Sequence, residues 1–516
     1  MRGTVSGPGV DPERIPVVVA SGQAIERDRL VSPVDLMERA SEQALAQVPD
    51  LRGGIERLSV VDVMSRTGPA PATELARRIG AGAGGTRCEV STIGGNTPQW
   101  LVNRASSDIA AGRLSVTLIA GAEAIRSSRA RRAGGLPQDD ADTGLVPDPV
   151  VGDDRPGVGP AESAIGLLAP VHLYPMFESV VAARAGHDAA EHRRAIGGLL
   201  APFTEKAATH PYAWFPTARS AGTIATPSPD NRIVSEPYTK LMSAFLGSDQ
   251  GAALVVCSLA AARRAGVADR AVFVWSGAEA TDVRFPASRP DPGRSPGIAA
   301  AGQALFGAAS LAAGPSASVG IDDVELVDLY SCFPSAVELA TEALDLNRDD
   351  RRGLTVTGGL PYFGGPGNNY TTHSIATLTD LLRDGAPARL GLATGLGWFI
   401  TKHALGVYGS SPPPRGFHRG DTATAQARID DSAVETALDL DDAAVATVVA
   451  ATVVRDYDGA ATAAPLIARL PDGRQMALAA ADDEVVGAVG ALDVPGLVGS
   501  SVVVQPGPAR YRLAAG

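Results

Sequence analysis

Two glycine-rich segments lead into helices and could hold a developing negative charge. They are STIGGNTPQW at 91–100 and GGPGNNY at 364–370. Backbone N–H groups at a helix N-terminus point away from the helix and, together with its dipole, stabilise an oxyanion. Acyl chemistry in such a cradle also needs a nucleophile and a group that moves protons. Neither segment contains a cysteine, so the pattern predicts a site prepared for acyl chemistry that lacks a thiol nucleophile.

Two residues near these segments are candidates for proton transfer. Tyr330 follows a buried strand, where its hydroxyl could exchange a proton with a substrate oxygen, and His373 begins the helix after the second segment. A tyrosine at a strand end also commonly packs with its hydroxyl satisfied, and a histidine at a helix start commonly caps the helix or lies in the core. Both alternatives stay open, and we predict Tyr330 and His373 as the catalytic residues.

Composition and charge narrow the function. The 516 residues carry a net charge of -12 at pH 7, so a nucleic acid is not an expected partner. Three cysteines without a CxxC spacing predict neither a disulfide framework nor a metal site. The N-terminal residues contain no apolar leader, and no apolar run approaches the ~18 residues of a membrane span. We expect a cytoplasmic protein of about two to four domains, without a membrane span or a bound cofactor.

Alternating strands and helices must position the candidate residues. Buried strands such as RIPVVVASGQA and SVTLIAGAEAI alternate with helical segments, which predicts an α/β protein with a largely parallel sheet covered on both faces. The halves repeat one another, since GGNTPQW, a helix and SVTLIAGAEAI match GGPGNNY, a helix and RLGLATGLGWFI. We predict an N-terminal half at 14–130 with 230–270, and a C-terminal half at 271–410.

Two further segments complete the predicted domain organisation. An insertion at 131–229 opens with acidic residues, glycine and proline and continues into helical patterns, which is typical of a lid over strand ends. After a serine- and proline-rich linker, the pattern changes to short strands with a hairpin turn at Asp472 and Gly473. We predict an additional all-β barrel of the OB type over 420–516.

These features resemble the thiolase superfamily. The duplicated halves, the insertion and the segment NRIVSEPYTKLMSAFLGSDQGAALVVCS at 231–258 are similar to its sterol-carrier-protein-2 branch, over about 15–408. With its β-rich extension, the chain most resembles the mycobacterial thiolase-like protein type 1 group, whose members carry the name acetyl-CoA acetyltransferase. The resemblance implies the layered α-β-α-β-α thiolase fold, a role in lipid metabolism and a coenzyme A thioester as ligand.

Thiolases use four catalytic loops, and each can be compared with this chain. The nucleophilic cysteine of the first loop falls on Gly95, and the asparagine or histidine of the second falls on Tyr330 in YSCF. The histidine of the third loop falls on Gly365 in GGP. The acid/base cysteine of the last falls on Ala393, or on Thr394 with a slip of one residue. All four are replaced, so the resemblance implies a thiolase-like protein that lacks the nucleophile and the acid/base residues.

Other polar side chains near these loops could line an acyl-CoA cleft. Asparagine amides could donate to a thioester carbonyl, or serve only the turn conformation. Adjacent Lys402 and His403 suit a phosphate or carboxylate, although neighbours on one strand point to opposite sides. A free cysteine is most often a small buried hydrophobe. The predicted cleft residues are Asn96, Cys332, Asn368, Asn369, Lys402 and His403.

Three aromatic or imidazole side chains of the insertion have less specific predictions. His187 and His192 lie in a charged helical segment and are predicted to be solvated. Trp214 in PYAWFP is either a core residue or a stacking surface for adenine, if coenzyme A docks against the insertion.

Three functions remain open. The protein could cleave a carbon–carbon bond of an acyl-CoA without an acyl-enzyme, as in a retro-aldol reaction. Some cysteine-less members of the resembled branch act in this way with a small β-barrel partner, and the C-terminal barrel could be a fused analogue. The protein could instead bind acyl-CoA or lipid without catalysis, or be a scaffold for a protein partner. Thiolases are commonly dimers through the sheet edge of the first half, so monomer and dimer both remain open.

Overall fold

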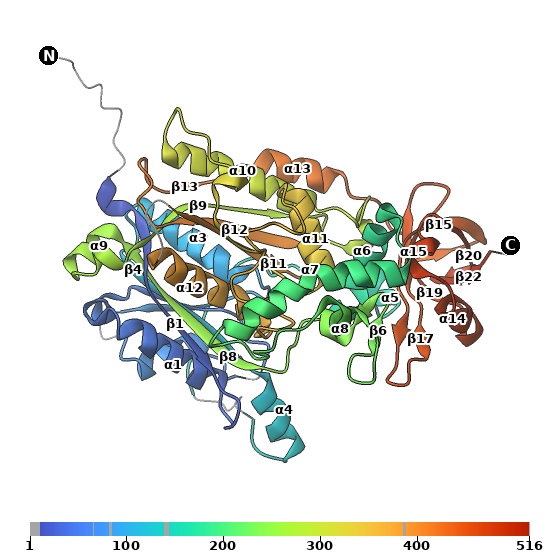
Figure 1. The fold of residues 1–516 in the computed structure, drawn as a ribbon, viewed down its shortest axis with the longest axis horizontal. Helices are drawn as coiled ribbons and strands as arrows, with labels where there is room; N and C mark the ends of the chain where they lie inside the picture. The colour runs from blue at the N-terminus through green and yellow to red at the C-terminus, as the bar shows by residue number, and fades with distance from the viewer. Residues whose placement is uncertain (1–10, 66, 82–84, 139–143, 385–388, 515–516) are drawn as a thin grey trace.

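A large mixed sheet runs through the body of the protein (Figure 1). The computed structural model describes residues 11–65, 67–81, 85–138, 144–384 and 389–514. The strands follow one another across the sheet in the order β10 (Leu326–Asp328), β11 (Leu390–Gly397), β12 (Lys402–Gly409), β9 (Val272–Thr281), β1 (Pro16–Ile25), β8 (Asp249–Ser258), β4 (Val116–Ala124), β2 (Arg57–Val60), β3 (Arg87–Ser91) and β5 (Val150–Val151).

The prediction of a largely parallel sheet is wrong in detail. Parallel pairing joins β2 to β3 and β4, β3 to β5, and β10 to β11. β8 runs antiparallel between β1 and β4, and β12 runs antiparallel between β11 and β9. The turn at 398–401 is too short for a parallel crossover, so β12 must return antiparallel to β11. The long insertion likewise brings β8 back in the opposite direction.

Helices form three layers around the two parts of this sheet. α3 (Thr97–Ala110) and α12 (Tyr370–Arg383) lie in the middle, in contact with strands of both halves (Figure 1). α1 (Pro33–Leu45) and α2 (Pro71–Arg78) cover the first half from outside, and α10 (Pro296–Ala313) and α11 (Pro334–Ala343) cover the second. The predicted α-β-α-β-α layering is confirmed. Ser32, directly before α1, is the predicted N-cap residue, and it forms a capping box with Asp35.

The insertion between β4 and β8 is helical, as predicted. It contains α4 (Ile125–Ala133), α5 (Pro160–Ala164), α6 (Pro170–Ala185), α7 (Ala189–Thr209) and α8 (Ala221–Ala225). α6 and α7 pack against α11 of the second half. Trp214 and Phe215 donate backbone hydrogen bonds to Phe363 and Tyr362, which fixes the insertion to the loop before α12.

A closed barrel forms the C-terminal end of the molecule, at the right of Figure 1. Its strands are β15 (Ala444–Ala451), β18 (Leu466–Arg469), β19 (Gln475–Ala480), β22 (Arg510–Leu513) and β20 (Ser501–Val504), in that order around the barrel. β19 and β22 are parallel, and α14 (Asp483–Gly490) lies between β19 and β20 in the chain. This is the five-stranded Greek-key arrangement of an OB-fold, so the predicted barrel is confirmed.

The barrel is docked closely on the body of the protein. The segment predicted as its linker and start contains β13 (His418–Arg419), which pairs with β9, and α13 (Ala423–Asp431), which packs on α10. The barrel strands therefore begin only at β15. Ile467, Ala450 and Ala477 of the barrel belong to the hydrophobic cluster of the second half and insertion.

One described helix, α10, is long and apolar enough to cross a membrane by length and composition alone. In the structure α10 packs on β9 and β12, and its small residues face these strands. This packing explains its apolar character as that of a core helix.

Candidate functional site

Gly95 and Tyr330 meet at the start of α3. Gly95 precedes Asn96, the N-cap residue of α3, and Tyr330 follows β10. A β-carbon built on Gly95 would clash with Tyr330 Oη, and it would lie 2.6 Å from Tyr330 Cζ and 2.6 Å from Leu396 O. The phenol therefore fills the space that a side chain at position 95 would need.

The Tyr330 phenol is held in a buried setting. Its backbone N–H donates to Thr394 Oγ1 at 2.8 Å, and its ring packs edge-on against Tyr370 at 5.5 Å between centroids. Burial raises the pKa of the Tyr330 hydroxyl well above its usual range. A neutral phenol of this kind can donate a hydrogen bond, but it gives up its proton less readily than an ordinary tyrosine.

His373 lies elsewhere in the core. Its Nδ1 is 2.8 Å from Gln23 Oε1 on β1, and its ring packs against Phe363 at 5.1 Å between centroids. Burial lowers the pKa of His373 to about 3. These contacts do not support the prediction that His373 shares a cleft with Tyr330. They agree with the alternative that His373 is a neutral histidine of the core.

The three asparagines of the glycine-rich loops have different roles. Asn368 accepts from Gly94 N at 2.9 Å and donates to the backbone and side chain of Asp62, each at 3.0 Å. Asn369 donates to Gly121 O at 2.6 Å. Asn368 and Asn369 therefore hold neighbouring loops together, which agrees with a role in loop conformation and not with donation to a thioester carbonyl. Asn96 Oδ1 is buried and accepts no hydrogen bond within the described parts of the chain.

Lys402 and His403 point to opposite faces of β12, as strand alternation predicts. Lys402 Nζ lies beside Gly94 and donates to Ile93 O at 2.5 Å and Asp153 O at 3.1 Å. Burial lowers the pKa of Lys402 to about 8. Lys402 therefore belongs to the Gly95 site, whereas His403 faces α10.

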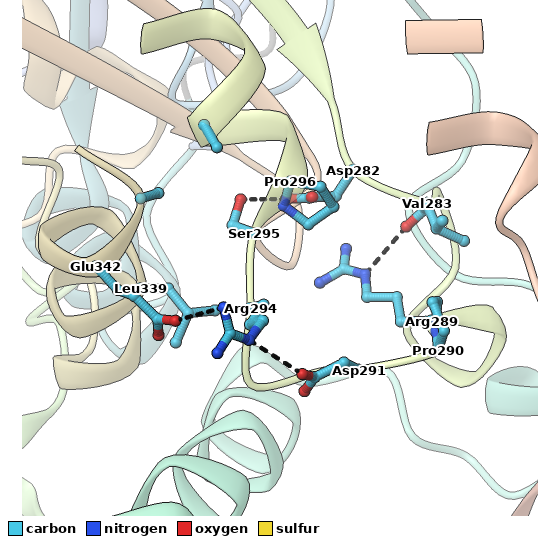
Figure 2. Close-up of a pocket in the computed structure, with 12 residues that line it drawn as sticks. Asp282, Val283, Arg289, Pro290, Asp291, Arg294, Ser295, Pro296, Leu339 and Glu342 are labelled. Carbon is cyan, nitrogen blue, oxygen red and sulfur yellow. Dashed lines mark hydrogen bonds and ion pairs between the residues drawn. The ribbon is translucent and has the colours of Figure 1, made fainter. Parts of the chain in front are cut away.

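His403 pairs with Asp282, which lines a cavity of about 380 Å³ (Figure 2). Its Nε2 lies 2.8 Å from Asp282 Oδ2, and Ser295 Oγ donates to the same oxygen at 2.5 Å. Burial raises the pKa of Asp282, but hydrogen bonds from His403 and Ser295 outweigh it and hold the pKa below its usual range. In a Ser-His-Asp triad the histidine lies between the serine and the aspartate. Here Ser295 and His403 both bind the same oxygen of Asp282, so the group holds the Asp282 carboxylate at the start of α10 and does not form such a triad.

The other two replaced thiolase positions, Gly365 and Ala393, are closely packed. A β-carbon on Gly365 would face Phe245 O at 3.1 Å. Ala393 is fully buried in the cluster around α3 and α12. Gly395, two residues later, is the glycine whose added β-carbon would lie 3.0 Å from Gly95 O. The part of β11 that meets Gly95 is therefore 394–396, closer to the slipped alignment than to Ala393.

Cys332 is a buried neutral thiol. Burial raises its pKa to about 12, so the thiol is not ionised at neutral pH. The described chain has three free cysteines, Cys88, Cys257 and Cys332.

An arginine and aromatic cluster lies next to Gly365. Trp214 is half-buried, stacks on Phe245 at 6.3 Å between centroids and lies under the Arg27 guanidinium at 5.7 Å. Arg219 lies over Phe215 at 6.0 Å. The sequence did not reveal this cluster, because Arg27 is brought to Trp214 only by the tertiary fold.

The prediction that His192 is solvated is wrong. The imidazole is fully buried, because α7 packs that side of the helix onto α6 and α11. His187 is half-buried, and its Nδ1 lies 3.4 Å from His192 Nδ1.

Comparison with known proteins agrees with this fold. No family model and no curated protein matches the chain. Among solved structures, a monomeric SCP2-thiolase-like protein type 1 from Mycobacterium smegmatis is similar over 98% of this chain and 100% of its own length, with 29% identity and a TM-score of 0.80. The acetyl-CoA acetyltransferase of Syntrophomonas wolfei is similar over 77% of this chain and 99% of its own, with 16% identity and a TM-score of 0.54. The Ltp2-ChsH2(DUF35) aldolase covers 78% of this chain and 99% of its own, with 18% identity and a TM-score of 0.57.

These likenesses show that the fold of the chain is that of the thiolase superfamily. Its full-length likeness is to the SCP2-thiolase-like structure, which extends over the C-terminal barrel as well as the layered body.

Proposed function

We propose that the protein binds acyl-CoA thioesters and carries out no thiolase acyl transfer. The observation that carries this proposal is the Tyr330 phenol in the place of a side chain at Gly95. Thiolysis and Claisen condensation pass through an acyl group on a thiolate. Glycine has no atom that can accept the acyl group, and the phenol blocks the space beside it.

Binding of a thioester is supported by the start of α3 beside Gly95 and by the aromatic and arginine cluster beside Gly365. Asn96 lies at the start of α3, where the helix N-terminus favours a partly negative carbonyl oxygen. Trp214 and Arg27 offer an aromatic face and a positive charge, which suit adenine and phosphate. The three free cysteines suit the reducing cytoplasm, which we include in the proposal.

A second candidate is carbon–carbon bond cleavage without an acyl-enzyme, which the neutral Tyr330 phenol and Lys402 favour. With its pKa near 8, Lys402 is partly neutral at physiological pH and could take the proton of a β-hydroxyl group. The bond between the α- and β-carbons then breaks, releasing a carbonyl compound and leaving a thioester enolate. Tyr330 stabilises the enolate oxygen, and the proton on Lys402 passes to the α-carbon.

Isothermal titration with coenzyme A and with octanoyl-CoA tests the main proposal. We expect saturable binding that is tighter for the acyl form and weaker at higher salt. A thiolysis assay with acetoacetyl-CoA should give no product in parallel. Absence of heat with both ligands would contradict acyl-CoA binding, and thiolysis above background would contradict the loss of acyl transfer. The lyase candidate is tested by incubation with a 3-hydroxyacyl-CoA and detection of the carbonyl product.

A further inference from the structure

Three side chains with metal-ligating atoms converge at the junction of the insertion and the second half. Glu178 comes from α6, His192 from α7 and Glu338 from α11. One ligand atom from each lies within 4.8 Å of the other two. All three are buried, with 0%, 0% and 2% of their surface exposed. The group lies outside the Gly95 site and is unused by the proposed function.

The contacts inside this cluster are short and incompletely satisfied. His192 Nε2 lies 2.5 Å from Glu178 Oε1 and 3.8 Å from Glu338 Oε2. Tyr238 Oη donates to the other oxygen of Glu178 at 2.5 Å. Neither oxygen of Glu338 accepts a well-aligned hydrogen bond within the described chain, although Arg348 Nη1 lies 2.8 Å from Oε1.

The charges of the cluster do not balance when both carboxyl groups are ionised. Two carboxylates face a single guanidinium, and Arg348 stands at the rim with 44% of its side chain exposed. Buried carboxylates without compensation are costly, so the cluster requires one more positive charge, either a proton or a cation.

A cation would satisfy carboxylate oxygens that the described chain leaves without a donor. Neither oxygen of Glu338 accepts a well-aligned hydrogen bond from the described residues. His192 Nδ1 is paired with His187 Nδ1 at 3.4 Å. With the proton of His192 on Nδ1, the Nε2 lone pair points at the carboxylates, which is the arrangement of a metal-binding histidine oriented by an outer partner.

We propose that Glu178, His192 and Glu338 bind a divalent transition metal ion of the zinc class. One imidazole nitrogen and two carboxylate oxygens are ligands that zinc accepts, and Tyr238 is placed to orient Glu178 from outside. The site is closed and joins two helices of the insertion to α11, so its role is structural. The side chain of Arg348 is 44% exposed and marks the side of the cluster that is nearest to solvent. The sequence predicted no metal site, because the three ligands lie on separate helices far apart in the chain.

Titration of the full-length, chelator-treated protein tests this site. With zinc chloride we expect about one ion bound per chain by calorimetry and a higher thermal unfolding midpoint. Manganese chloride should bind more weakly, and magnesium chloride should not bind. Cobalt(II) should give visible absorption bands that report coordination by nitrogen and oxygen.

Two variants on one helix sharpen the result. Glu338→Gln should abolish zinc binding and the rise in midpoint, because it removes a carboxylate while keeping the shape. Glu342→Gln, one turn further along α11 on the surface, should bind zinc as the wild type does. If wild-type protein binds neither zinc nor manganese and its midpoint does not change, a shared proton fills the cluster and the proposal is overturned. If Glu338→Gln fails to fold, the wild-type titration and the cobalt spectrum still decide.

Discussion

The phenol of Tyr330 lies where a side chain at Gly95 would begin, with Cζ 2.6 Å from the position of an added β-carbon. The two residues come from different halves of the duplicated fold. Glycine at position 95 and tyrosine at position 330 therefore form one packed unit, in which the absence of one side chain makes room for the other. Restoring a side chain at 95 alone cannot restore a nucleophile in a usable position.

Gly95→Ala should destabilise the protein by about 1–3 kcal/mol, because the new methyl group meets both Tyr330 and Leu396 O. Chemical denaturation measures the change. Gly198→Ala is the matched control: this exposed glycine lies inside α7, with nothing within 4 Å of an added β-carbon. It should stabilise the protein by about 0.5–1 kcal/mol through helix propensity.

A double-mutant cycle attributes the cost to the phenol. Gly95→Ala should cost less in a Tyr330→Ala background than in the wild type, since the ring is gone. Equal costs in both backgrounds would show that Leu396 O alone opposes the methyl group.

The sequence predicted the layered body and the barrel because their signals are local. The cap at Ser32, the apolar strand runs and the change of period after Gly409 are each visible within a few residues. Strand direction depended on pairings between distant segments, which no local pattern records, so the antiparallel β8 and β12 were missed.

The same limit applies to the candidate site. Tyr330 was found because it follows a strand in a loop with a recognisable counterpart. The burial of His192 was missed because it depends on which side of α7 meets α6 and α11. Asp282 follows β9 and His403 lies on β12. Their 2.8 Å contact depends on the pairing of these distant segments, so the sequence did not predict it.

The protein should be a monomer of 52.7 kDa. The outer edge of β3 is partly occupied by the chain's own β5, through the register of Val90 with Val150 and Ser91 with Val151. Asp148 fixes this segment by accepting hydrogen bonds from Ala72 N at 2.7 Å and Thr73 Oγ1 at 2.5 Å. An edge that is already paired cannot pair with a second copy in the same way.

Light scattering coupled to gel filtration over a wide range of protein concentration measures the mass. Twice the monomer mass at all concentrations would contradict the prediction. A dimer that appears only in Asp148→Ala would instead support protection of the edge by β5.

Trp214→Leu should weaken coenzyme A binding by about 5- to 100-fold, because base stacking on an aromatic ring contributes on the order of 1–3 kcal/mol. Trp214→Phe keeps an aromatic face and should lose less. Calorimetric titration of both variants provides the measurement, and Arg129→Ala, on the exposed surface of α4, is the control. Unchanged affinity in Trp214→Leu would place the nucleotide elsewhere.

Stability should fall as the pH is lowered from about 6.5 toward 3, partly because of His373. The folded pKa of this imidazole is about 3, compared with an ordinary value of 6.5. Between these values the unfolded chain binds a proton that the folded chain does not, so lower pH favours unfolding. One such group contributes a slope of up to about 1.4 kcal/mol per pH unit, and none above the ordinary value. His210, whose pKa burial lowers to about 4, acts in the same direction.

Urea unfolding at pH values between 7.5 and 5 compares the wild type with His373→Gln. The variant cannot take up the proton, so its free energy of unfolding should fall less steeply with decreasing pH. Carboxyl groups contribute equally to both proteins, and the difference in slope isolates the imidazole. Parallel curves for the wild type and His373→Gln would mean that His373 takes up its proton over the same pH range in the folded and the unfolded protein, which contradicts the prediction.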